Sequence, residues 1–145
     1  MTEKDDFDLR NFMPFLLNLA AEQSSLGFQR TYKNRYGMLR TEWRVLFHLG
    51  NYGEMTAKEI GERAVMHKTK ISRAVAKLSQ RRYLTRTRDE RDRRSERLAL
   101  TPAGLVVYRE LRQEAEAYEA QLGKQFTAGE VVLLRMMLRR LAGLD

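Results

Sequence analysis

Apolar residues along most of this chain recur at steps of three and four, which is the spacing of one face of an α-helix. The first such series lies close to the N-terminus and comprises Phe12, Phe15, Leu16, Leu19 and Ala20. It continues more loosely as far as Tyr32. The pattern predicts a long N-terminal helix over about residues 8–35, which ends near Arg35 to Gly37.

Capping residues predict two short helices after this long one. Thr41 has the side chain of an N-cap, and the helix that it opens is expected to stop at the glycine-containing turn 50–53. Thr56 and Glu59 form a T-x-x-E capping box, in which each side chain accepts the other residue's backbone N–H group. This box predicts a second helix that runs to about Arg63.

A third short helix is predicted from Lys68 to about Gln80. Ile71, Val75 and Leu78 recur at helical spacing and form its apolar face. The opposite face is polar and basic. The helix is therefore expected to pack on the core with one side and to expose the other.

The pattern changes after residue 82. Two short apolar runs, Tyr83 to Thr85 and Leu98 to Leu100, flank a segment made almost wholly of charged residues, which is typical of a β-hairpin. A helix start follows at once, because Thr101 is a cap and Pro102 suits the first helical position. This helix is expected to reach about Lys124.

A second capping box, Thr127 with Glu130, opens a last helix that ends at about residue 142. Apolar side chains cover too much of its circumference for a surface helix of a monomer. They are Val131, Val132, Leu133, Leu134, Met136, Met137, Leu138 and Leu141.

Three short helices and a charged hairpin, with a long helix on either side, follow the element order of a winged helix-turn-helix. The sequence thus predicts a mainly α fold with a small β-hairpin wing. The winged helix-turn-helix is expected at about residues 38–101, between terminal helices at about 8–35 and 102–142. No linker, repeat or low-complexity segment interrupts the chain, so we expect a single domain over residues 1–145.

The positive charge of the chain is concentrated in one third of it. The net charge is +8, and residues 56–101 hold 14 Lys and Arg against 6 Asp and Glu, while the rest of the chain holds 13 of each. Such a localised field attracts polyanions, of which nucleic acid is the usual partner and an acidic membrane surface the less common one.

The side chains that enzymes and metal sites use are scarce. The 145 residues include no cysteine, two histidines far apart, no G-x-S-x-G motif and no phosphate-binding glycine loop. We therefore expect no enzyme, no metal and no cofactor. The early apolar stretch 12–21 is short and is interrupted by Pro14 and Asn18, so we expect neither a signal peptide nor a membrane span, and a cytoplasmic location.

The polar face of the third helix has the composition of a DNA recognition helix. Short Thr and Ser side chains let a helix lie deep in the major groove, while Lys and Arg reach phosphates or guanine. The candidate DNA-binding residues are Lys68, Thr69, Lys70, Ser72, Arg73 and Lys77. The alternative is a solvated basic face without a partner.

The hairpin tip, residues 86–97, contains six arginines. Guanidinium groups are favoured in a narrow minor groove, where the negative potential is enhanced. The candidate wing contacts are Arg88, Arg91, Arg93 and Arg94. Asp89 and Asp92 are expected to pair with neighbouring arginines and to hold the tip in shape. A salt-bridged surface hairpin is the alternative.

The run Asp92 to Gly104, DRRSERLALTPAG, resembles the wing of the MarR (multiple antibiotic resistance regulator) family and its entry into the dimerisation helix. The segment Leu39 to Leu46 is similar to the family's second-helix entry, and Lys68 to Arg73 lies where its recognition helix should. The resemblance covers essentially the whole chain. It implies a dimeric transcription regulator in which Arg94 enters the minor groove and Asp92 supports the wing.

One position departs from the family pattern. Members commonly have glycine before the first wing strand, and this chain has Arg82 there. If the backbone still turns left-handed at Arg82, the non-glycine residue costs about 1 kcal/mol. The end of the recognition helix is then under local strain.

The terminal helices, Phe12 to Tyr32 and Val131 to Leu141, are more apolar than a monomer of this size should expose. Burial between two chains would remove the excess, so we expect a homodimer that binds a pseudo-palindromic operator. The alternative is that these helices cover each other within one chain. The alternative function is binding of nucleic acid without sequence preference, as in an architectural protein. A preference for one duplex sequence over random duplex distinguishes a sequence-specific regulator from such a protein.

The resemblance also implies a small aromatic acid as the effector that releases a repressor from DNA. An apolar slot with a cationic end is the kind of site that such a ligand needs. The candidate residues are Arg10, Met13, Trp43, Arg44, Phe47 and His48. The alternative is that the Trp43 and Phe47 rings belong to the core and that His48 is a hydrogen-bonded structural residue. The operator, the regulated genes and the choice between repressor and activator do not follow from the sequence.

Overall fold

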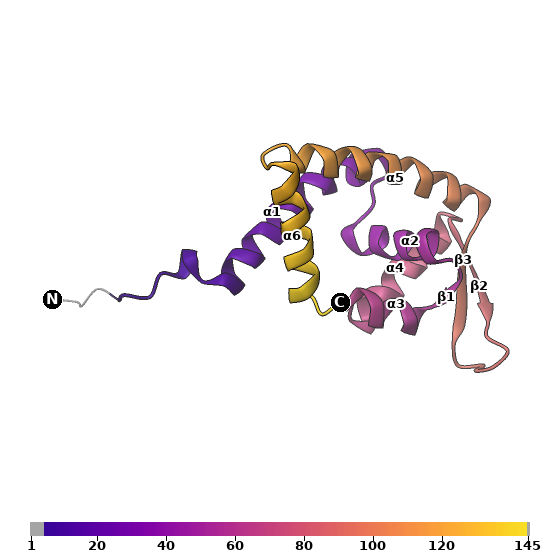
Figure 1. Ribbon diagram of the computed structural model, residues 1–145. Helices are drawn as coiled ribbons and strands as arrows, with labels where there is room; N and C mark the ends of the chain where they lie inside the picture. Colours follow the sequence, from indigo (N-terminus) through magenta and orange to yellow (C-terminus); the bar gives the residue numbers. More distant parts are fainter. Residues whose placement is uncertain (1–4, 145) are drawn as a thin grey trace. The chain divides into compact units, whose positions relative to one another are not determined.

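The computed structural model describes residues 5–144 (Figure 1). The chain forms one compact unit that ends at Arg112 and a second that begins at Gln113. The expectation of a single domain stays a prediction. None of the helices within residues 5–144 has both the length and the apolar character that crossing a bilayer requires.

The observed elements confirm a mainly α fold with a hairpin wing. Helix α5 begins in the first unit and ends in the second, and α6 belongs to the second unit. In chain order the elements are the 3-10 turn η1 (Leu9–Asn11), α1 (Met13–Tyr36), α2 (Arg40–Tyr52), β1 (Met55–Thr56), α3 (Ala57–Ala64), α4 (Lys68–Gln80), β2 (Leu84–Arg88), β3 (Glu96–Leu100), α5 (Pro102–Gly123) and α6 (Ala128–Leu141).

The first helix ends where the sequence predicts. Gly37 follows α1 with a φ of 65°, a left-handed conformation in which glycine carries no steric penalty. Its N–H group donates to the carbonyl oxygen of Lys33 over 2.8 Å. At the other end α1 begins only at Met13, because the preceding residues form η1, which Asp8 caps.

The start of α2 differs from the prediction. The helix begins at Arg40, and Leu39, rather than Thr41, is its N-cap residue. The side chain that completes this end is Glu42, whose Oε2 accepts the N–H group of Leu39 over 2.7 Å. A glutamate at the third helical position can cap a helix from inside, so Thr41 lies already in the first turn.

The two predicted capping boxes both mark true helix starts. Thr56 Oγ1 accepts the N–H group of Glu59 over 3.2 Å at the start of α3. At the start of α6 the exchange is mutual, because Thr127 Oγ1 accepts from the Glu130 N–H over 3.1 Å and Glu130 Oε1 accepts from the Thr127 N–H over 2.9 Å.

The wing is the hairpin of β2 and β3, and a third strand joins it. The sheet order is β1-β3-β2, with all pairs antiparallel. Leu84 pairs with Leu100 and Arg88 with Glu96, while Met55 of β1 pairs with Leu98. The hairpin was predicted, but β1 was missed and Tyr83 lies outside the strand.

The core of the first unit forms where α4 packs between α2 and the wing. The predicted apolar face of α4 is buried, with Ile71 and Val75 each 3% exposed and Leu78 fully buried. Val45, Leu46 and Leu49 of α2 and Leu84 and Leu98 of the wing complete this core. The core therefore fixes one side of α4 and leaves its polar side outside.

At the end of α4 the backbone does turn left-handed, which is the condition under which the sequence predicts a steric cost. Arg82 has a φ of 61°. Its N–H group donates to Ser79, and the next N–H group, that of Tyr83, donates back to Leu78, each over 2.9 Å. This pair of bonds is a Schellman motif, which normally has glycine at the position of Arg82.

The second unit pairs the end of α5 with α6. Arg135 Nη2 lies 3.3 Å from Glu119 Oε1 and joins the two helices. Between them lies an apolar groove of about 330 Å³ with Leu122, Phe126 and Leu134 among its lining residues. Apolar side chains of α6 remain exposed, including Val132, Leu133, Met137 and Leu141.

Candidate nucleic-acid interface

The polar face of α4 is fully available to a partner. All six predicted residues of this helix are exposed: Lys68, Thr69, Lys70, Ser72, Arg73 and Lys77. The helical period sets Thr69 and Arg73 opposite the buried face, with Lys68 and Ser72 on one flank. The predicted set thus forms one continuous surface.

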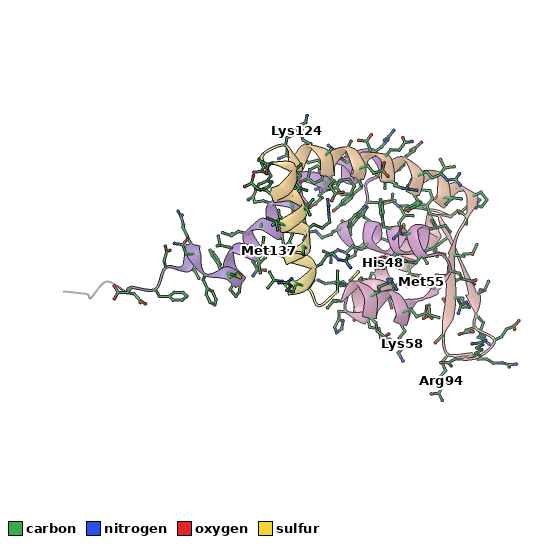
Figure 2. All side chains as sticks on the ribbon, in the orientation of Figure 1. His48, Met55, Lys58, Arg94, Lys124 and Met137 are labelled. Carbon is green, nitrogen blue, oxygen red and sulfur yellow. The ribbon has the colours of Figure 1, made fainter. Side chains whose placement is uncertain are left out.

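A groove beside α4 brings the helix and the wing together. It has a volume of about 730 Å³ and is formed by α3, the start of α4 and the wing. Its lining residues are Thr56, Ala57, Lys58, Gly61, Glu62, Met66, Lys68, Ile71, Ser72, Arg94, Ser95 and Glu96. Arg94 therefore shares one groove with Lys68 and Ser72, and Figure 2 shows Arg94 and Lys58 at the same edge of this unit.

The groove carries more positive than negative charge. Lys58, Lys68 and Arg94 supply three cations, and Glu62 and Glu96 supply two carboxylates. The Glu96 carboxylate is already engaged, because its Oε2 accepts from Arg86 Nε over 2.6 Å. A groove with this balance is suited to the phosphates of a duplex.

Asp92 supports the wing, though not in the way the sequence suggested. Its Oδ1 accepts the backbone N–H group of Arg94 over 3.0 Å, and its Oδ2 accepts the Ser95 hydroxyl over 3.3 Å. Asp89 likewise accepts the N–H group of Arg91 over 3.2 Å. The expected pairing of these aspartates with guanidinium groups is corrected: short Asp side chains hold the turn through its backbone.

The arginines of the wing divide into two groups. Arg86 pairs with Glu96, and Arg97 Nε lies 3.4 Å from Glu54 Oε1, so both brace the stem of the hairpin. The four predicted contact residues at the end of β2 and in the tip, Arg88, Arg91, Arg93 and Arg94, are exposed. The stem is thus held by ion pairs while the tip presents cations outward.

Four of the six predicted effector residues lie together on α2. The Trp43 and Phe47 rings have centroids 5.0 Å apart, and Phe28 of α1 contacts Trp43 at 5.3 Å. The Trp43 indole N–H is buried and has no hydrogen-bond partner within residues 5–144. A buried donor without a partner is rare and needs an explanation.

The other effector candidates are placed differently. Met13 is exposed and lies 15 residues before Phe28 on α1, about 22 Å along the helix, so Met13 and the preceding Arg10 do not join the Trp43 cluster within one chain. His48 Nδ1 lies 2.6 Å from the carbonyl oxygen of Arg44 and therefore donates to it. This bond agrees with the structural alternative for His48.

Sequence reasoning missed Lys58. A single lysine in the first turn of a short helix carries no pattern of its own, and only the fold brings it to the groove beside Arg94. Within residues 5–144, no three His, Cys, Asp or Glu side chains gather as a metal site would require.

Comparison with known proteins gives a family match. Residues 36–95 match the model of the MarR family, and this segment spans α2, α3, α4, β2 and the wing tip and ends just before β3. Among characterised relatives, the transcriptional regulator SarZ of Staphylococcus aureus is 29% identical over 76 residues, which are 52% of this chain and 51% of SarZ. The chain therefore spans about half the length of the curated relatives that it matches.

Solved structures extend the likeness to the whole fold. A MarR family transcriptional regulator from Silicibacter pomeroyi is 26% identical, with a TM-score of 0.79 over 94% of this chain and 99% of that one. BpsR of Bordetella bronchiseptica, whose DNA binding is regulated by 6-hydroxynicotinic acid, is 20% identical, with a TM-score of 0.86 over 97% of this chain and 100% of BpsR. At that identity BpsR indicates the fold alone.

Proposed function

Because residues 36–95 match the model of the MarR family, we propose that the chain belongs to this family and regulates transcription by binding duplex DNA sequence-specifically. One observation carries the proposal: Lys68 and Ser72, on one flank of the exposed polar face of α4, line the same cationic groove as the wing residue Arg94. The alternative, a solvated basic face without a partner, does not explain why the wing brings an arginine to the flank of this helix.

The two elements suit different parts of the duplex. Helix α4 would enter the major groove, where Ser72 and Arg73 reach base edges and the lysines reach phosphates. Arg94 would enter the neighbouring minor groove. Asp92 would keep the tip folded before DNA arrives, because it already bonds the backbone N–H group of Arg94.

We further propose that the protein acts as a homodimer. Apolar residues of α1 remain exposed, among them Met13 (61%), Leu16 (44%) and Leu19 (45%). In the second unit Val132 is 63% and Leu133 52% exposed. Burial of both terminal helices against a second copy would remove these surfaces from water, and two recognition helices would then read a pseudo-palindromic operator.

Selection of bound duplexes from a random pool tests the proposal. We expect a palindromic sequence whose half-sites lie about one helical turn apart, bound at least about 10³-fold more tightly than random duplex. Arg73→Ala should then relax the preference at one base position per half-site. A pool that yields no shared sequence would contradict the proposal and support binding without sequence preference.

A small aromatic acid is the effector that the Trp43 cluster fits best, and its binding would release a repressor from the operator. The unpartnered Trp43 N–H is a donor for a carboxylate or phenol oxygen, and the half-buried Arg44 on the same helix supplies a positive charge. The neighbouring rings of Phe28 and Phe47 supply apolar walls. Such a ligand must prefer the conformation that DNA disfavours.

The effector is tested by titrating hydroxylated aromatic acids, including 6-hydroxynicotinic acid, into the complex with the selected duplex. We expect at least one acid to weaken DNA binding by about tenfold, within the usual range of coupling energies. Trp43→Phe keeps an aromatic side chain, although a smaller one, and removes the donor, so it should lower this response and leave the affinity for DNA unchanged. Unchanged DNA affinity with every acid at millimolar concentration would contradict the effector proposal.

A further inference from the structure

Arg81, the residue directly after α4, binds the ends of two other helices. Its Nη1 donates to the carbonyl oxygen of Tyr36, and its Nη2 donates to that of Gly37 over 3.1 Å. The same Nη2 lies 3.8 Å from Glu42 Oε1 at the start of α2. One guanidinium thus joins α4 to the corner where α1 ends and α2 begins.

The groups that Arg81 binds need a cation. The last carbonyl groups of a helix have no partner within the helix and carry a partial negative charge. Glu42 is 1% exposed, and its Oε1 is buried without a hydrogen bond within residues 5–144. A buried carboxylate is tolerated only beside a compensating charge, and Arg81 supplies one.

Tyr36 extends the same cluster to α5. Its hydroxyl donates to the Glu110 carboxylate, while its backbone carbonyl accepts from Arg81. Burial and this hydrogen bond raise the pKa of Tyr36 to about 12, so the hydroxyl keeps its proton at neutral pH. The end of α4 is therefore connected through one tyrosine to α5.

A fixed end matters because α4 acts as a lever. The helix has 13 residues and a length of about 20 Å, so a tilt of about 3° at Arg81 moves its first residues by about 1 Å. Hydrogen bonds to base edges tolerate only a few tenths of an ångström. Contacts from long Lys and Arg side chains to phosphates adapt more easily and carry no sequence information.

We infer that Arg81 is a positioning residue for sequence discrimination, acting through the orientation of α4 without touching DNA. The inference rests on the proposed function, since it assigns to Arg81 the precision of the base readout. Loss of Arg81 lowers the preference for the operator over random duplex, and leaves binding to random duplex nearly unchanged.

The variant Arg81→Gln tests this inference, and Arg82→Gln is its control. Arg82 is the next residue in the chain and its side chain is exposed, so the control removes the same charge without removing the contacts of Arg81. The probes are the duplex selected by the natural protein and a scrambled duplex of equal length, with affinity measured by fluorescence anisotropy. We expect Arg81→Gln to lower the ratio of the two affinities about tenfold, the effect of one mismatched base pair. Arg82→Gln should leave the ratio within about twofold. Arg81→Lys keeps the charge but lacks the planar fork, so it should restore only part of the ratio.

Tyr36→Phe is the second variant. It tests the inference if circular dichroism shows that Arg81→Gln does not fold. It removes the bond to Glu110 and keeps the carbonyl that Arg81 binds, so we expect a smaller loss of the ratio, about threefold. In the double variant the losses should be less than additive, because both act through one cluster.

An unchanged ratio in Arg81→Gln, or in Tyr36→Phe where only that variant folds, would overturn the inference. Equal losses on both duplexes would also overturn it, because they would mean a merely structural or electrostatic role. Failure of the proposed function is distinguishable, because the natural protein itself would then show a ratio near one.

Discussion

Gly104, in the first turn of α5, lies so close to Tyr83 that a β-carbon on it would be 1.9 Å from the Tyr83 carbonyl oxygen. That oxygen also accepts the N–H group of Thr101 over 3.0 Å, and Thr101 Oγ1 in turn accepts the N–H group of Gly104 over 3.0 Å. The backbone after α4 is thus clamped against the start of α5. This approach explains physically why the run L-T-P-A-G needs its glycine.

Gly104→Ala should destabilise the protein by about 3 kcal/mol, because neither backbone segment can yield. Urea denaturation followed by circular dichroism measures the change. Gly129→Ala is the matched control, since nothing lies within 4 Å of a β-carbon there and alanine favours a helix. Equal stability of the two variants would mean that the clamp is looser than the structure indicates.

Arg82→Gly should stabilise the protein by about 1 kcal/mol, because glycine adopts a φ of 61° without the steric cost that arginine carries. Thermal and urea denaturation both report this gain. Lys77→Gly, at a regular helical position of α4, should instead cost about 1 kcal/mol. A loss of stability in both variants would contradict the assigned conformation of Arg82.

Stability should fall between about pH 10 and pH 12 in a manner that depends on Tyr36. Its pKa is raised from 10.0 to about 12 on folding, so in this window the folded state holds a proton that the unfolded state has lost. Stability contributed by the protonated hydroxyl is complete below pH 10 and is lost as the pH rises. Tyr36→Phe should flatten the fall in the free energy of unfolding over that range.

Tyr52→Phe provides a control of opposite sign. Hydrogen bonds from Arg63 and Asn51 lower the pKa of Tyr52, so its ionisation favours the folded state as the pH approaches 10. Removal of its hydroxyl should therefore abolish this gain below pH 10 and leave the fall between about pH 10 and pH 12 unchanged. If the free energy of unfolding depends on pH in the same way in the natural protein and in both variants, neither tyrosine changes its pKa on folding.

Asp92→Ala and Arg94→Ala should weaken DNA binding in a coupled way. Arg94→Ala removes one phosphate-neutralising cation per protomer, lowers the salt slope by about one, and weakens operator and random duplex nearly alike. Asp92→Ala loosens the tip that positions Arg94, so the double variant should be less than additive. Fluorescence titrations at two salt concentrations measure both effects.

Asp92→Asn is the control for this pair, because an amide oxygen can still accept the Arg94 N–H group. It should keep most of the affinity that Asp92→Ala loses. Full additivity of Asp92→Ala and Arg94→Ala, or an unchanged salt slope in Arg94→Ala, would indicate that the wing is a solvated hairpin that does not contact DNA.

The natural protein should sediment as a dimer at micromolar concentration, with twice the chain mass of 17.0 kDa. Met137 is 48% exposed on α6, so Met137→Lys places a charge in the proposed dimer surface and should weaken the dimer at least about tenfold. Gln125→Lys adds the same charge outside α6 and should leave the mass unchanged. A natural protein with the mass of one chain would refute the dimer.

The elements that depend on local signals were predictable from the sequence. The bounds of α4 and the two capping boxes follow from side chains within a few positions of the feature. The left-handed turn at Arg82 is predicted only as a condition, because the resembled family commonly has glycine there. Strand β1 was missed because two residues show no periodicity, and its pairing partner Leu98 is distant in the sequence. Thr41 failed as a cap because Glu42 satisfies the same helix end from inside.

In the candidate site, too, the features that depend on local signals were predictable and those that depend on the fold were not. Exposure of the polar face of α4 follows from helical spacing, so the sequence predicts correctly that its six residues are exposed, and their role in DNA binding stays a prediction. The contribution of Lys58 to the groove depends on how α3 approaches the wing, which no local pattern encodes. Arg81 is one of several arginines in a basic stretch, and only the fold distinguishes it, by bringing it to the end of α1.

The three-stranded sheet also sets an order of assembly. Strands β2 and β3 are neighbours in the sequence, so the hairpin closes a short loop, whereas Met55 meets Leu98 only after the intervening segment with α3 and α4 has been enclosed. Closing a longer loop costs more chain entropy and slows the step that closes it. We therefore expect the hairpin to form early and β1 to join late, so that the wing becomes anchored to the helices only when α3 and α4 have folded.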